Sequence, residues 1–132
     1  MIKIKNKKVK KWINRKINKY KTYSVKEALA YYIYTIKVTQ KLEYNTLIKN
    51  LENIMLNIRN NNYVVEKINS IYIEEINNFW IMTHNQMLSY GKKVFEDLII
   101  TEKELTEENI FREFILLMRL YSPDNIEKFY KN

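Results

Sequence analysis

The sequence of 132 residues contains no cysteine and only one glycine and one proline. Without cysteine the chain forms no disulfide and no thiolate site, so its composition does not restrict the redox state of its compartment. A single glycine and a single proline leave few positions for tight turns or for a glycine-rich phosphate loop. Long helices are therefore the expected secondary structure.

Long apolar runs are also missing. The sequence has no stretch of about 18 apolar residues that could cross a bilayer. Its charged N-terminal residues lack the apolar segment of a signal peptide. We therefore expect no transmembrane segment and a cytoplasmic location. The length suits one hydrophobic core.

The residues that usually carry catalysis or bind metals are scarce. His84 is the only histidine, which excludes a site with several histidine ligands, and Glu74 and Glu75 lie too far from it along a helix to pair with it. Neither a nucleophile elbow nor a phosphate loop is present. Five carboxylates fit the first turn of a helix better than a metal cluster: Glu102, Glu104, Glu107, Glu108 and Glu113. We expect a non-enzymatic protein without metal or cofactor.

The composition points to A/T-rich coding. Asn, Ile, Lys and Tyr, whose codons are A/T-rich, together supply 66 of the 132 residues. Such a bias adds lysines without selection for charge, so the isoelectric point of about 9.5 is weak support for binding a polyanion. The position of the charges is more informative than their number.

The basic residues are concentrated at the N-terminus. Residues 1–26 hold eleven basic side chains and no acidic one, whereas residues 27–132 hold twelve basic and fifteen acidic side chains. Codon bias alone is not expected to concentrate charge at one end. This asymmetry divides the chain into a basic arm, residues 1–22, and a helical body, residues 23–132.

Within the arm, apolar residues recur at helical spacing. They predict a basic amphipathic helix over 8–21, while the alternation of Ile and Lys at 2–5 leaves a short strand or extended tail there as an alternative. Lysines neutralise phosphates and aromatic rings stack on bases, so this combination is typical of single-strand and RNA binders. The predicted contact residues are Lys7, Lys8, Lys10, Lys11, Trp12, Arg15, Lys16, Lys19 and Tyr20.

Other interpretations of the arm remain open. Its aromatic residues could instead pack on the body while its lysines are merely solvated. The predicted helix could also lie on an anionic membrane with Trp12 at the interface, although its apolar face has no leucine. A third use is docking on an acidic protein surface, which the lysines would steer and the rings anchor.

The first helix of the body has the clearest start. Ser24 followed by Glu27 is a capping box. Further along this helix, Tyr31, Tyr32 and Tyr34 point in directions too different to enter one core. Tyr is favoured in interfaces, and we therefore predict partner contacts for Tyr31 and Tyr34.

The remaining periodicity predicts a single compact all-α bundle of about five to six helices. The expected elements are a helix over 46–59, a long helix over 63–90 capped by Gly91 with a break near Ser70 left open, a short helix near 94–99, a helix starting at Thr101 or Thr106, and a last helix starting at Ser122 and Pro123.

Small cysteine-free helical chains with A/T-rich coding and a charged arm resemble, in composition, proteins that phages and mobile elements use to block host machines, CRISPR nucleases included. The leading hypothesis is an inhibitor of this anti-defence type, whose basic arm engages a nucleic-acid-processing machine or its RNA or DNA. The alternatives are a direct DNA- or RNA-binding regulator or small ribonucleoprotein subunit, and a helical oligomeric scaffold. Homo-oligomerisation is left open.

Overall fold

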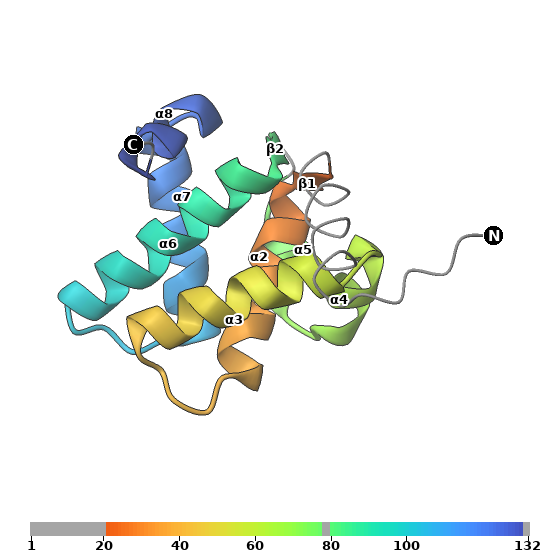
Figure 1. Cartoon of the computed structure of the whole chain (residues 1–132), viewed down its shortest axis with the longest axis horizontal. Coiled ribbons are helices and arrows are strands. Elements are labelled where there is room, and N and C mark those ends of the chain that lie inside the picture. The colour runs from red at the N-terminus through yellow and green to blue at the C-terminus, as the bar shows by residue number, and fades with distance from the viewer. Residues whose placement is uncertain (1–20, 78–79, 131–132) are drawn as a thin grey trace, which may run out of the picture.

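Figure 1 shows the computed structural model, which describes residues 21–77 and 80–130. These residues form seven α-helices, one 3-10 turn and a two-stranded antiparallel ribbon, so the predicted all-α bundle is confirmed. The predicted helix over 8–21 and the strand alternative at 2–5 lie outside the described residues, apart from Lys21.

The chain follows the order β1 (Thr22–Ser24), α2 (Val25–Val38), α3 (Tyr44–Asn57), α4 (Asn61–Lys67), α5 (Ile71–Glu75), β2 (Ile81–Thr83), α6 (His84–Ile100), α7 (Glu107–Leu120), α8 (Pro123–Glu127) and the 3-10 turn η1 (Lys128–Tyr130). Helix α2 runs through the middle of the bundle and packs against α3, α4, α5 and α7 (Figure 1). Helix α6 packs against α3, α7 and α8. These two helices organise one continuous core.

Helix α2 begins where the sequence predicts. The Ser24 hydroxyl accepts a hydrogen bond from the Glu27 backbone N–H at 3.1 Å, and the Glu27 carboxylate accepts one from the Ser24 backbone N–H at 3.0 Å. This capping box satisfies two backbone donors that would otherwise lack partners at the start of the helix. Residues Ala28 to Ile33 are all buried, which explains why this stretch is apolar on every side.

The predicted single helix over 63–90 is wrong. That stretch contains the end of α4, all of α5 and β2, and the start of α6. The expected break at Ser70 is present, because the Ser70 hydroxyl caps α5 by accepting from the Tyr72 N–H. A second interruption precedes α6, where Thr83 and Gln86 form another capping box. Cap side chains compete with helix continuation for backbone N–H groups, and here they override the apolar periodicity.

Gly91 is inside α6 and is not the left-handed cap that its position suggested. A Cβ at this position would lie 2.6 Å from Leu51 Cδ2 and 2.7 Å from Tyr32 Cε1. The missing side chain therefore lets α6 approach the buried Tyr32 ring. The short helix expected near 94–99 is the C-terminal half of α6.

The last two predicted helix starts are confirmed. Thr106 rather than Thr101 caps α7, with its hydroxyl accepting from the Asn109 N–H. Ser122 caps α8, with Pro123 at the first helical position. At the other end of the described chain, β1 pairs with β2 in the register Thr22 with Thr83, Tyr23 with Met82 and Ser24 with Ile81. The ribbon thus ties the beginnings of α2 and α6 together.

Candidate binding surfaces

The residues predicted to contact a partner fall into two groups. Nine lie outside the described residues: Lys7, Lys8, Lys10, Lys11, Trp12, Arg15, Lys16, Lys19 and Tyr20. The other two are on α2. Tyr31 is buried, so its ring does not reach the surface, whereas Tyr34 is half-buried. The structure therefore does not bring Tyr31 and Tyr34 together on one exposed surface.

Tyr31 instead fastens β1 to α4. Its hydroxyl donates to Asn61 Oδ1 at 3.0 Å, and Asn61 Nδ2 donates to the Thr22 carbonyl at 3.1 Å. Burial, together with the nearby Tyr23 and Glu27, raises the pKa of Tyr31 far above its ordinary value, so the hydroxyl stays protonated. The sequence could not reveal this role, because Asn61 is 30 residues away.

The basic segment joins the body at a fixed point. Lys21, the first described residue, donates from Nζ to the Ile58 carbonyl at 2.5 Å, at the C-terminal end of α3. A cation there also suits the negative end of the helix dipole. Burial lowers the pKa of Lys21, while Glu27 acts in the opposite direction. Residues 1–20 hold nine basic side chains and no acidic one. The residue that follows them, Lys21, is hydrogen-bonded to the body.

Beside Lys21 lies the only histidine. The Tyr23 hydroxyl is 3.3 Å from His84 Nδ1, and the two rings are 6.1 Å apart between centroids. Burial, and then the charge of Lys21, lower the pKa of His84, while burial and Glu27 raise the pKa of Tyr23. Both groups are therefore neutral at pH 7. Tyr23 is fully buried and His84 is half-buried, and the pair joins β1 to α6.

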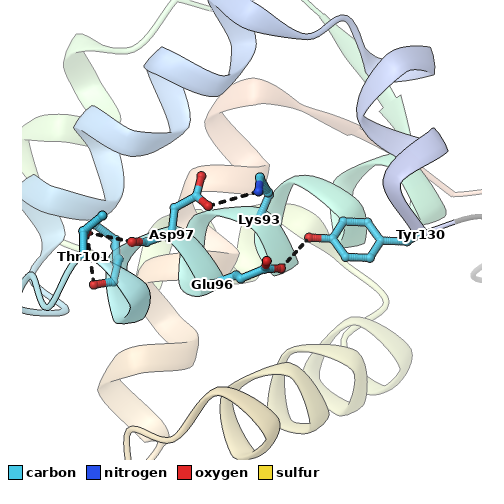
Figure 2. Close-up of polar contacts among 6 residues, drawn as sticks. Lys93, Glu96, Asp97, Thr101 and Tyr130 are labelled. Atoms are coloured by element: carbon cyan, nitrogen blue, oxygen red, sulfur yellow. Dashed lines mark hydrogen bonds and ion pairs between the residues drawn. The ribbon is translucent and has the colours of Figure 1, made fainter.

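Charged side chains on α6 form a second polar group, shown in Figure 2. Lys93 pairs with Asp97 at 3.2 Å one turn later, and the Tyr130 hydroxyl donates to Glu96 Oε2 at 3.1 Å. Burial and a hydrogen bond to Asp97 raise the pKa of Glu113 on α7. The contact between Asp97 and Glu113 joins α6 to α7, and the contact between Glu96 and Tyr130 joins α6 to η1. These three carboxylates therefore all have partners within the bundle.

The acidic stretch after α6 is divided between a loop and a helix start. Glu107 and Glu108 lie in the first turn of α7, as the sequence predicted, where Glu107 pairs with Lys37 at 2.8 Å. Glu102, two residues after the end of α6, has a positive φ of 56°. The first-turn prediction is wrong for Glu102 and Glu104, which precede α7, and for Glu113, which lies in the middle of α7. No group of three or more acidic or histidine side chains is arranged to hold a metal ion within 21–77 and 80–130.

A groove that the sequence did not suggest lies between α7 and the segment after α5. It encloses about 590 Å³ and is lined by Glu75, Ile76, Asn77, Trp80, Ile115, Met118 and Arg119. Trp80 is 36% exposed. Trp, Met and Arg are enriched in the cores of protein interfaces. A signal was available in the sequence, because α7 carries Ile115, Leu116 and Leu120 outside its main apolar stripe.

None of the helices in the described part of the chain is long and apolar enough to cross a lipid bilayer. Every buried side-chain nitrogen or oxygen atom among the described residues has a hydrogen-bond partner, so the core offers no unsatisfied polar group to a ligand. The chain matches no protein-family model, no curated protein and no solved structure.

Proposed function

We propose that this chain is a non-enzymatic binding protein whose basic N-terminal segment engages a nucleic-acid-processing machine or the RNA or DNA held by that machine. The separation of charge carries this proposal. Residues 1–20 contain nine basic and no acidic side chains, whereas residues 21–130 contain thirteen basic and fifteen acidic ones. A dense positive segment on a nearly neutral body has the charge distribution of a phosphate-binding arm.

The contacts at the start of the body support this division of roles. Lys21 is bonded to the Ile58 carbonyl and β1 is paired with β2, so no described residue acts as a loose linker between the segment and the bundle. The carboxylates of α6 and α7 are largely paired within the bundle, which reduces their competition for the basic segment.

The finer proposal is an inhibitor of the anti-defence kind, encoded by a phage or mobile element, in which Lys7, Lys8, Lys10, Lys11, Arg15, Lys16 and Lys19 contact phosphates or acidic side chains and Trp12 stacks or anchors. It rests on composition and on the position of the charge. The alternative is a DNA- or RNA-binding regulator or ribonucleoprotein subunit, which would bind naked oligonucleotide without a protein partner.

The test reverses charge in the segment and, separately, on the body. Lys7, Lys8, Lys10 and Lys11 are changed to Glu in one variant, and the exposed Lys41, Lys49, Lys67 and Lys103 are changed to Glu in a control with the same net charge. Binding is measured by fluorescence anisotropy with labelled single-stranded RNA and DNA at several salt concentrations, and by affinity capture from host lysate with and without nuclease.

We expect the segment variant to lose binding and the control to keep most of it. A steep fall in affinity for naked oligonucleotide as salt rises would favour the regulator. Capture of a protein target that survives nuclease treatment would favour the inhibitor. If the segment variant retains every interaction of the unchanged protein, both forms of the proposal fail.

A further inference from the structure

Helix α7 carries apolar residues outside its buried face. Ile110, Phe114 and Leu117 point into the core and are buried. On the outer side, Leu116 is 48% exposed and Leu120 is 61% exposed. Neighbouring exposed apolar side chains of this kind mark a candidate interaction surface. Leu116 and Leu120 are therefore candidates for contact with a partner.

The exposed leucines lie next to the groove that contains Trp80. Residues four positions apart lie on the same face of a helix. The outer part of α7 therefore has two adjacent rows, one formed by Ile115 and Arg119 and the other by Leu116 and Leu120. Ile115 and Arg119 line the groove, while Leu116 and Leu120 form a ridge beside it. One surface thus offers both an apolar hollow and an apolar ridge.

Two side chains of opposite charge line this groove. Glu75 comes from the end of α5 and Arg119 from α7, and both line the groove. Neither takes part in an ion pair or side-chain hydrogen bond with another described residue. A groove of one charge would fit a partner of the opposite sign. A groove with one charge of each sign, neither paired by another described residue, matches the charges of a second copy turned by a two-fold axis.

We propose that the groove and the outer side of α7 form a homodimer interface between two copies of this chain. The two α7 helices cross about the two-fold axis, so that the Leu116 and Leu120 ridge of each copy packs into the hollow beside Trp80 of the other. Glu75 of each copy then faces Arg119 of its partner, twice per dimer. The dimer carries two basic segments, which would strengthen binding to an extended polyanion. The interface itself does not depend on what these segments bind.

The test measures the mass of the full chain in solution. The protein is freed of nucleic acid by nuclease treatment and studied by sedimentation equilibrium from micromolar to submillimolar concentration. We expect the mass to rise with concentration from the 16.2 kDa of one copy toward twice that value. Glu75→Arg and Arg119→Glu, tested separately, should each raise the dissociation constant about tenfold or more, because each puts two like charges face to face.

The two variants provide the decisive control when they are mixed. In a dimer of one Glu75→Arg copy with one Arg119→Glu copy, both contacts again join opposite charges, so the mixture should associate as the unchanged protein does. Lys49→Glu, an equal charge reversal on the exposed side of α3, should leave dimerisation unchanged. Circular dichroism of each variant checks that the fold is intact.

Three outcomes would overturn the proposal. They are an unchanged protein that stays monomeric over the whole range, a dimer that tolerates both single reversals, and single variants that fail to rescue each other in the mixture. The lysine reversals at 7, 8, 10 and 11 should leave this dimer intact, so failure of the arm and failure of the interface give different results.

Discussion

Two regions of the body contain the same strand-to-helix junction, a short strand followed by a capping box and a helix, which we call a joint. In the first, β1 leads through the Ser24 and Glu27 capping box into α2, and in the second, β2 leads through the Thr83 and Gln86 box into α6. The two strands pair antiparallel, so the two joints are adjacent to each other. Seven residues after each cap stands a buried tyrosine, Tyr31 in one helix and Tyr90 in the other.

The two regions differ at the next residue. Eight residues after the cap, α2 has Tyr32 and α6 has Gly91, and these two positions are in contact. The Tyr32 ring fills the space that Gly91 leaves, its hydroxyl donates to the Met87 carbonyl at 2.5 Å, and its ring packs edge-on against Phe114 at 5.1 Å between centroids. One joint therefore supplies a large side chain and the other a gap, which is how two similar units pack without clashing.

The largest expected effect comes from removing that side chain. Tyr32→Ala should lower the free energy of unfolding by about 3–5 kcal/mol, because it leaves a cavity between α2, α6 and α7. Tyr34→Ala, two residues along the same helix at a half-buried position, is the matched control and should cost about 1 kcal/mol. Urea titrations followed by circular dichroism compare the two. Equal losses would show that Tyr32 does not hold the two units together.

The capping boxes are expected to give an intermediate effect. Ser24→Ala and Thr83→Ala should each cost about 0.5–2 kcal/mol, because each removes the acceptor for a backbone N–H at the start of a helix. Ser24→Asp and Thr83→Asp keep an acceptor and should restore most of that stability. The same urea titrations give the four values. A large loss of unfolding free energy at one cap and none at the other would show that the two joints are not energetically equivalent.

The sequence predicted one joint and missed the other, although both carry the same motif. Ser24 precedes an isolated apolar helix, so its cap was the strongest local signal available. Thr83 lies on an apolar stripe that runs on through Ile68, Tyr72 and Ile76, and that longer periodicity predicted a continuous helix. Ile68 and Ile76 are indeed buried, but from separate elements. Periodicity reports which residues are buried and cannot show where the chain turns.

The candidate surfaces were predicted less well than the helices, also for physical reasons. Tyr31 was assigned to an interface because helix geometry forces three nearby tyrosines in different directions, yet α4 covers it through Asn61. The groove beside Trp80 brings together residues more than 30 positions apart, from α5 and α7. Contacts of this kind depend on tertiary packing, which no local pattern contains.

The smallest expected effect is on the pH dependence of stability. It concerns the hydrogen-bonded pair that links the two joints, Tyr23 of the first and His84 of the second. His84 is the first residue of α6, where the positive end of the helix dipole disfavours a cation. Burial, and then Lys21, lower its pKa below the ordinary value of 6.5. Across the interval between the lowered pKa and 6.5, the unfolded chain binds more protons than the folded one. Stability must therefore fall as pH falls through that interval.

His84→Gln keeps a polar side chain and removes the titration. We expect its unfolding midpoint in urea to change less than that of the unchanged protein as pH is lowered from 7 into the interval below 6.5. Tyr23→Phe removes the hydrogen bond but leaves the burial and Lys21 in place, so it should lose stability equally at every pH while keeping the slope. A slope that survives His84→Gln would assign it to carboxylates with a lowered pKa, such as Glu107, and the neutral state of His84 would then contribute nothing to joining β1 to α6.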